Sequence, residues 1–191
     1  MPLARRTWLA VPLLTLVAAC NPPANPRLDR APVVRGPDGR EYRLLAKDAY
    51  KAFYDSSGRL DRLEYDSNGD GKADHVVFYD GGTAPHRMEV DTDFDGRVDR
   101  WETYDDAGHL VSVGTSRRHG NRPDVWTFPG PNGETQRVEI DSDGDGRVDR
   151  WQRWEGSHLV TEDVDTDGDG RPDHRLRYDA HGKVSGIEML H

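Results

Sequence analysis

The apolar residues of this chain fall in short runs that are rich in Val, Leu, Trp and Tyr. Three such runs are Val98–Tyr104, Leu110–Val113 and Val148–Trp154, and each lies near residues that favour turns. Runs of this length and composition are typical of β-strands. No segment keeps the helical spacing i, i+3, i+4, i+7 without a glycine or a turn cluster nearby. The pattern therefore predicts strands and no long helices.

A turn signature recurs between these runs. It consists of an aromatic residue, an Asp and then a Gly that precedes an apolar run, as in Tyr54–Leu60, Tyr104–Leu110 and Tyr178–Val184, with weaker versions at Tyr79 and Trp154. An Asp side chain can accept the backbone amide two residues ahead, and Gly tolerates positive φ. The signature predicts tight β-hairpin turns.

A second repeat is a nine-residue acidic segment. Four copies occupy Asp66–Asp74, Asp91–Asp99, Asp141–Asp149 and Asp165–Asp173, so their starts are 25, 50 and 24 residues apart. The step of 50 is two periods, which predicts another copy at Ser116–Asp124. That segment matches at its later positions but lacks the early carboxylates, as expected for a repeat that kept its fold and lost its ligands.

Together the two repeats predict an all-β domain over residues 41–191. Each unit of about 25 residues is a strand, a tight turn, a second strand and an acidic loop, and about five antiparallel hairpins follow one another. The spacing leaves open whether the sheet is flat, curved into a solenoid or partly closed. A single layer buries little, which agrees with a hydrophobic content of 34%.

Composition and charge narrow the class of protein. The 191 residues carry a net charge of −9, which argues against a nucleic-acid partner because phosphate contacts need clustered Lys and Arg. The single Cys excludes an internal disulfide framework and a cysteine-rich zinc site. Regularly spaced aromatic residues argue against full disorder.

The N-terminus resembles the export signal of bacterial lipoproteins. Residues 1–19 contain a basic start and the short apolar stretch Trp8–Leu16, followed by small residues before Cys20, as in a lipobox. The resemblance implies cleavage before Cys20, which would carry acyl chains such as palmitate and anchor the protein to a membrane. Asn21 favours the bacterial outer membrane by the same resemblance. An ordinary signal peptide is the alternative.

Residues 20–40 contain five prolines and no apolar periodicity. Such a segment favours extended polyproline II structure at about 3.1 Å per residue. We expect a tether between the lipidated Cys20 and the domain, with a structured N-terminal arm as the alternative. Loss of residues 1–19 leaves 24 basic residues against 35 acidic ones, a charge of −11.

The acidic loops have the chemistry of a cation site. Two like charges about 4 Å apart repel by roughly 4 kcal/mol at an effective dielectric of 20, so several carboxylates in one tight loop need a counter-ion. Oxygens from positions 1, 3, 5, 7 (a carbonyl) and 9 can surround a hard cation at about 2.3–2.6 Å, which suits Ca²⁺ better than Mg²⁺. Position 8 would point inward and tie the loop to the sheet. Solvated acidic turns without an ion are the alternative.

These loops resemble the calcium loops of EF-hands, thrombospondin type 3 repeats and integrin-type β-hairpins. An EF-hand loop is flanked by helices and closes with Glu at its twelfth position, which only Glu102 provides here. The closer resemblance is to Asp-x-Asp-x-Asp-Gly-x-x-Asp loops between strands. It implies about four Ca²⁺ ions, held with the modest affinity of extracellular modules. The implied ligands are Asp66, Asn68, Asp70, Lys72 and Asp74; Asp91, Asp93, Asp95, Arg97, Asp99 and Glu102; Asp141, Asp143, Asp145, Arg147 and Asp149; and Asp165, Asp167, Asp169, Arg171 and Asp173.

Two other residue sets have a structural and a functional interpretation. Trp101, Trp126 and Trp151 occupy equivalent places, which predicts an aromatic ladder stacked within the sheet or a sugar-binding stripe. His75 and His174 follow acidic loops, where we expect a solvated strand face. No catalytic motif is present, and we do not expect an enzyme.

The sequence thus predicts an exported, surface-anchored calcium-binding repeat lipoprotein with a structural or adhesive role. Its expected partners are the membrane, through the lipid, and an envelope polysaccharide or surface protein. A carbohydrate- or envelope-binding module with structural calcium is the alternative function.

Overall fold

The protein is almost entirely β-structure, as the sequence predicted. The structure, a computed structural model, describes residues 28–118 and 120–190. They form one antiparallel sheet of 14 strands, preceded by the short 3-10 helix η1 (Leu28–Arg30). The strands are β1 (Val33–Arg35), β2 (Glu41–Lys47), β3 (Tyr50–Tyr54), β4 (Leu60–Tyr65), β5 (His75–Phe78), β6 (Arg87–Val90), β7 (Arg100–Tyr104), β8 (Leu110–Thr115), β9 (Val125–Pro129), β10 (Thr135–Ile140), β11 (Arg150–Glu155), β12 (His158–Val164), β13 (His174–Tyr178) and β14 (Val184–Met189).

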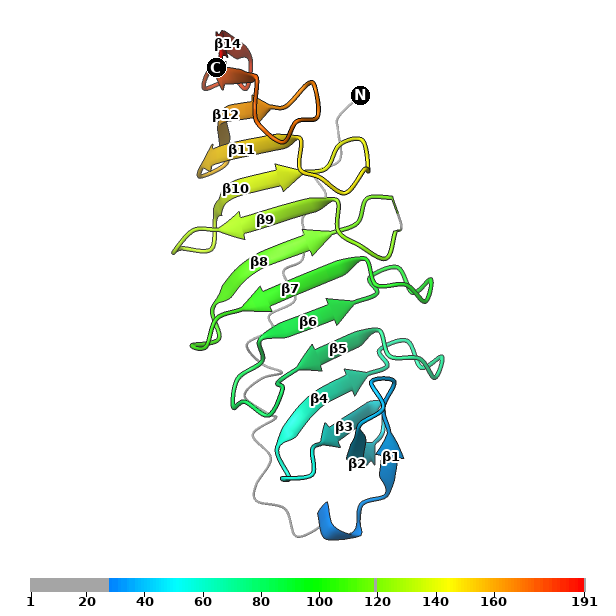
Figure 1. Ribbon diagram of the computed structural model, residues 1–191. Helices are drawn as coiled ribbons and strands as arrows, with labels where there is room; N and C mark the ends of the chain where they lie inside the picture. Colours follow the sequence, from blue (N-terminus) through cyan, green and yellow to red (C-terminus); the bar gives the residue numbers. More distant parts are fainter. Residues whose placement is uncertain (1–27, 119, 191) are drawn as a thin grey trace.

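The strands follow one another across the sheet in chain order. Among the described elements, backbone contacts join each strand only to its neighbours in the chain, and η1 to β2. Side chains reach further at one end, where the Arg62 guanidinium of β4 lies over the Tyr42 ring of β2. Figure 1 shows the result, a long twisted ladder of strands in a single layer. The sheet is open, which excludes the partly closed shape among those that the sequence left undecided.

This topology sorts the connections by type. Because each strand runs opposite to the one before, every second connection lies on the same edge. The acidic segments connect β4 to β5, β6 to β7, β10 to β11 and β12 to β13, and Ser116–Asp124 connects β8 to β9. All five loops therefore lie along one edge, and the tight turns lie along the other (Figure 1).

The predicted hairpin turns are present. In the turn after β3, the Gly58 amide donates to the Asp55 carbonyl at 3.0 Å, and Gly58 has a φ of 81°. The Asp55 carboxylate accepts the amides of Ser57 at 2.8 Å and Arg59 at 2.9 Å. The turns after β7 and β13 repeat this geometry with Asp105 and Asp179.

The folded part begins earlier than the sequence indicated. Strand β1 pairs with β2 around a turn at Gly36–Gly39, and Leu28 of η1 packs on the buried cluster that contains Leu60 and Leu63. Residues 28–40, which we assigned to the tether, therefore form a structured arm. The signal segment 1–19 and Cys20 lie outside the described residues. No helix in the described ranges is long and apolar enough to span a bilayer.

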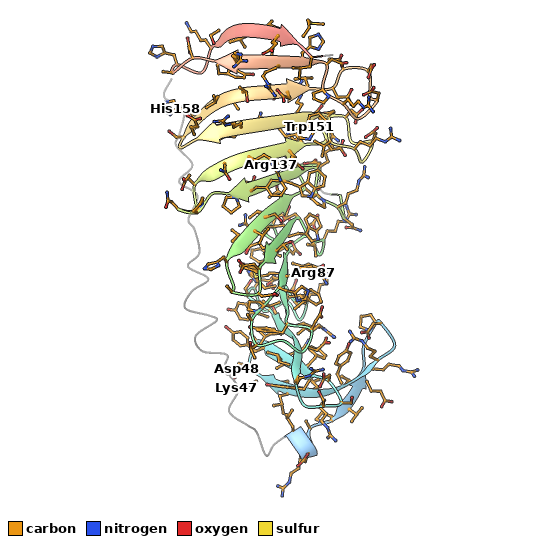
Figure 2. All side chains as sticks on the ribbon, turned by 60° about the vertical axis from the view of Figure 1, so that its left-hand side comes forward. Lys47, Asp48, Arg87, Arg137, Trp151 and His158 are labelled. Carbon is orange, nitrogen blue, oxygen red and sulfur yellow. The ribbon has the colours of Figure 1, made fainter. Side chains whose placement is uncertain are left out.

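The two faces of the sheet differ. One, the tyrosine face, carries two clusters of buried side chains, which are Tyr54, Leu60, Leu63 and Tyr79, and Met88, Val90 and Tyr104. The other, the tryptophan face, carries Trp101, Trp126 and Trp151, whose side chains are half-buried. Figure 2 shows Trp151 on the sheet, and no second layer of described residues covers it.

The tryptophans do not form the stacked ladder that we expected. In the register, Trp101 faces Gly114, which faces Trp126, and Trp126 faces Glu139, which faces Trp151. The three rings thus sit on alternate strands, about 9–10 Å apart. Gly114 or Glu139 of the intervening strand lies between successive tryptophans in the register.

Candidate metal centres

The first Asp of each acidic loop shapes the turn from inside. In Asp141–Asp149, the Asp141 carboxylate accepts the amides of Gly144 at 2.6 Å and Gly146 at 2.9 Å. Gly146 has a φ of 98°, which a residue with a Cβ adopts only under strain. The position-6 glycines Gly71, Gly96 and Gly170 donate to Asp66, Asp91 and Asp165 in the same way.

The third and fifth positions hold the loop backbone through short-range hydrogen bonds. Asp143 accepts the Asp145 amide at 3.0 Å, and Asp145 accepts the Arg147 amide at 2.7 Å. The other three loops repeat both bonds. The position-7 residues Lys72, Arg97, Arg147 and Arg171 are thus fixed through their amides, and ligation by their carbonyls stays a prediction.

The ninth position is held by a residue that sequence reasoning missed. The Asp149 Oδ2 atom accepts both the amide of Ser142, at 3.0 Å, and its hydroxyl, at 2.6 Å. Ser67, Thr92 and Thr166 make the same pair of contacts with Asp74, Asp99 and Asp173. The sequence signal was a Ser or Thr directly after the first Asp in all four loops.

These hydrogen bonds favour the ionised carboxylate. The Ser67 hydroxyl bond, with backbone amides, holds the pKa of Asp74 below its usual value although burial opposes the shift. The Thr166 hydroxyl and amide lower the pKa of Asp173 in the same way. In these two loops the hydrogen bonds thus keep the ninth carboxylate in its ionised form.

Three loops bring carboxylates of positions 1, 3 and 9 to one point. In each group, one oxygen from every residue lies within 4.8 Å of the others, and the groups could hold a metal ion. The groups are Asp91, Asp93 and Asp99; Asp141, Asp143 and Asp149; and Asp165, Asp167 and Asp173. Asp70, Asp95, Asp145 and Asp169 at position 5 are not part of these groups.

Two oxygens in these groups are buried without a hydrogen-bond partner. They are Oδ1 of Asp91, a residue that is only 7% exposed, and Oδ1 of Asp149. A buried carboxylate oxygen without a donor is costly, and a bound cation would satisfy it. This observation fits a metal ion at the shared centre.

The first loop differs in one ligand. It has Asn68 at position 3, so its carboxylates are those of Asp66, Asp70 and Asp74. The hydroxyl, amide and glycine contacts of the other loops are all present. At position 3 this loop therefore offers a neutral amide oxygen, where the other three acidic loops offer a carboxylate.

Glu102 does not join the second loop's group. It lies in β7 on the tyrosine face, 7% exposed, where its carboxylate accepts hydrogen bonds from Arg100 and from the Tyr104 hydroxyl. An EF-hand brings its twelfth residue back to the ion by entering a helix, whereas here a strand carries it away. We therefore remove Glu102 from the ligand set.

The loop at Ser116–Asp124 keeps the fold without the ligands. The Ser116 hydroxyl accepts the Gly120 amide at 2.9 Å, in place of the first Asp. Asp124 is buried, as Asp74 is in the first loop, but Arg117 binds it through its amide at 3.2 Å and its Nε at 3.1 Å. The Arg117 guanidinium thus takes the place of the Ser or Thr hydroxyl that binds the ninth residue in the acidic loops.

His75 and His174 are not on a solvated face. Both are half-buried on the tyrosine face, and their Nδ1 atoms are buried without a partner among the described residues. Burial lowers the pKa of His75, although nearby Asp74 and Glu102 oppose the shift. We had expected exposed side chains because both histidines directly follow the last Asp of an acidic loop, but each is the first residue of a strand and faces the tyrosine face.

Comparison with known proteins identifies no family. No family model and no curated protein matches this sequence significantly. Among solved structures, the chain is similar to a mutant of S. aureus TarM in complex with Fondaparinux, alpha-GlcNAc-glycerol and UDP, with a TM-score of 0.44 and 10% identity. The match covers 52% of this chain and spans about a fifth, 20%, of the TarM chain.

Proposed function

We propose that this protein is an exported calcium-binding repeat lipoprotein with a structural or adhesive role, in which Ca²⁺ stabilises the sheet edge. The observation that carries the proposal is the recurrence of one carboxylate group in three loops, with buried unpartnered oxygens of Asp91 and Asp149. The first loop, with Asn68 in place of a carboxylate, would supply a weaker fourth site.

The charge of the whole chain favours the same function. Four Ca²⁺ ions would change the charge of the chain without residues 1–19 from −11 to −3, which relieves most of its self-repulsion. Oxygen-only ligands select Ca²⁺ over softer metals. Without a closing bidentate Glu, we expect affinities of about 10⁻⁴–10⁻³ M, typical of extracellular modules.

Calorimetric titration with Ca²⁺ tests the proposal. We expect four sites in the native protein and a higher Tm with Ca²⁺ than with a chelator. The triple variant D93N/D143N/D167N, which removes one carboxylate from each group, should lose at least tenfold in affinity at three sites. Asp106→Asn, in an exposed tight turn on the opposite edge, is the matched control. No heat of binding and an unchanged Tm in chelator would refute the proposal.

The anchor at Cys20 is a proposal from the sequence alone. Its lipid would hold the protein at a bacterial membrane, with the outer membrane as the expected location. The partner would then be an envelope polysaccharide or a surface protein. We assign no catalytic role, because the carboxylates that could support one already shape the loops.

A carbohydrate-binding role is the second candidate. The observation that favours it is the row of half-buried rings of Trp101, Trp126 and Trp151, on a face that no second layer within residues 28–118 and 120–190 covers. Sugar rings stack on such surfaces. In a pull-down with insoluble envelope polysaccharide, Trp126→Ala should lose most of the binding and Trp154→Ala, on the opposite face, should retain it. Equal binding by both variants would exclude this role for the tryptophan row.

A further inference from the structure

The ligand-free loop reaches over the acidic loop that follows it. The Arg118 guanidinium donates a hydrogen bond to the Ser142 carbonyl. Arg122 Nη2 donates to the Gly144 carbonyl at 2.6 Å and lies 3.9 Å from Oδ2 of Asp141. Asp141 is 1% exposed, so the nearby cation acts on a buried carboxylate. Two positive groups of one loop thus lie at the rim of the next loop's acidic group.

The glycines of the Asp141–Asp149 loop make room for these arginines. A Cβ at Gly144 would overlap the Arg118 guanidinium, and a Cβ at Gly146 would overlap that of Arg122. At the corresponding positions of the Asp165–Asp173 loop, Gly168 and Gly170, a Cβ would meet no atom within 4 Å. The arginines are therefore closely packed against this one loop.

The other loops have a weaker version of this contact. From position 7, Arg147 Nη1 donates to the Gly168 carbonyl at 3.5 Å. Lys72 Nζ lies 3.4 Å from where a Cβ of Gly96 would stand. Only the Ser116–Asp124 loop adds a second cation, because it has Arg118 at position 3, where the other four loops have Asp or Asn.

We propose that Arg118 and Arg122 act as a built-in counter-cation that holds the 141–149 loop in its ligand-binding shape and lowers its affinity for Ca²⁺. The proposal rests on the calcium-binding function proposed above. The guanidinium groups donate to the loop's carbonyls and offset the charge of Asp141 without an ion. A divalent cation entering the group then meets their positive charge, which a neutral side chain would not present.

Site-resolved NMR titration tests this role. The amides of Gly96, Gly146 and Gly170 each donate to the first Asp of their own loop, so each reports binding in one loop. During a Ca²⁺ titration of the native protein, we expect Gly146 to reach its midpoint at the highest concentration of the three. In R118Q/R122Q, the Gly146 midpoint should fall by about three- to tenfold while the Gly96 and Gly170 midpoints stay unchanged.

Two further variants support the measurement. Arg153→Gln removes an exposed arginine of β11, paired with Glu155 at 2.7 Å, and should move no midpoint. The single variant Arg122→Gln is milder and keeps the test available if the double variant does not fold. A Gly146 midpoint that is unchanged or higher in the folded variants would overturn the proposed role.

Hydrogen exchange separates this role from calcium binding itself. If no glycine amide of the native protein responds to Ca²⁺, the proposed function fails. In calcium-free buffer, the Gly146 amide should still exchange faster in R118Q/R122Q than in the native protein, because the loop has lost its two clamping side chains. Equal exchange rates would overturn the clamp, whatever the result with Ca²⁺.

Discussion

At the scale of the residue, Asp38 shows how closely a single carboxylate of this chain is tied to its surroundings. It accepts hydrogen bonds from the Tyr42 hydroxyl at 2.5 Å, from Arg40 Nε at 2.5 Å and from the Arg40 amide at 3.0 Å. The Tyr42 bond, then the Arg40 bond, lowers the pKa of Asp38 to about 2. Burial, and then the bond to Asp38, raises the pKa of Tyr42 to about 12.

These pKa shifts predict a pH-dependent stability. Asp38 has a folded pKa below its unfolded value of about 3.8, so its contribution is complete above pH 4 and is lost as the pH falls toward 2. Tyr42 has a folded pKa above 10, so its contribution is present below pH 10 and is lost as the pH rises toward 12. Asp38→Asn should therefore have a lower Tm than the native protein at pH 6, and the difference should shrink between pH 4 and pH 2.

Tyr42→Phe is the control for this pair. It removes the hydroxyl bond and leaves the carboxylate with Arg40, so the Tm difference between native protein and variant should again shrink below pH 4, but less than for Asp38→Asn. A Tm difference that is constant from pH 6 to pH 2 would contradict the assigned cause.

At the scale of the element, the acidic loop is a self-supporting unit. Its hydrogen bonds join positions 1 to 4 and 6, 3 to 5, 5 to 7, and 9 to 2, all within nine residues. The chain enters and leaves it through backbone bonds to the strands, as between the Asp173 amide and the Val164 carbonyl at 2.8 Å. Most of the loop shape is therefore encoded within its own nine residues, and in Asp141–Asp149 the side chains of Arg118 and Arg122 add two contacts from outside.

The position-6 glycine predicts a measurable cost at this scale. Gly170 has a φ of 88°, and a Cβ at this position would meet no atom within 4 Å, so Gly170→Ala strains the backbone without a steric clash. We expect the free energy of unfolding to fall by about 1–2 kcal/mol in urea denaturation with chelator present. Gly186→Ala in β14, where the backbone is extended, should leave it nearly unchanged. Equal effects of the two substitutions would show that φ is not the cause.

At the scale of the whole molecule, contacts between successive strands hold the sheet together. Stability in such an array is approximately a sum over units and their neighbours, so it can differ along the chain. The buried clusters lie around β3 to β7, whereas Val184, Ile187 and Met189 of β14 are 50%, 68% and 59% exposed. The free energy of local opening should therefore differ between these regions.

Hydrogen exchange measured by mass spectrometry should reveal this gradient. Peptides that cover β4, where Leu60–Leu63 are buried, should exchange more slowly than peptides that cover β14. If calcium stabilises the loop edge, adding Ca²⁺ should slow exchange in the strands that flank the four acidic loops, and D93N/D143N/D167N should lose the effect. Uniform exchange along the chain would instead indicate one cooperative unit.

The sequence by itself predicted the all-β fold, the hairpin turns after β3, β7 and β13, and the position of every acidic loop. Turn chemistry and loop spacing act over a few residues, so Asp55, Gly58 and the Asp-rich repeats could be read without a structure. It also identified Ser116–Asp124 as a loop without ligands. It favoured a tether over the structured arm at 28–40, because proline-rich composition outweighed a three-residue strand that gains stability only by pairing with β2.

Only the tertiary structure decided what depends on register and on residues far apart in the chain. The register placed Trp101, Trp126 and Trp151 on alternate strands, and it turned Glu102 away from the loop. The strand spacing brought Arg118 and Arg122 to residues 24 and 22 positions ahead, in a loop two strands away. Such contacts arise from how strands align and twist against each other, which no nine-residue pattern records.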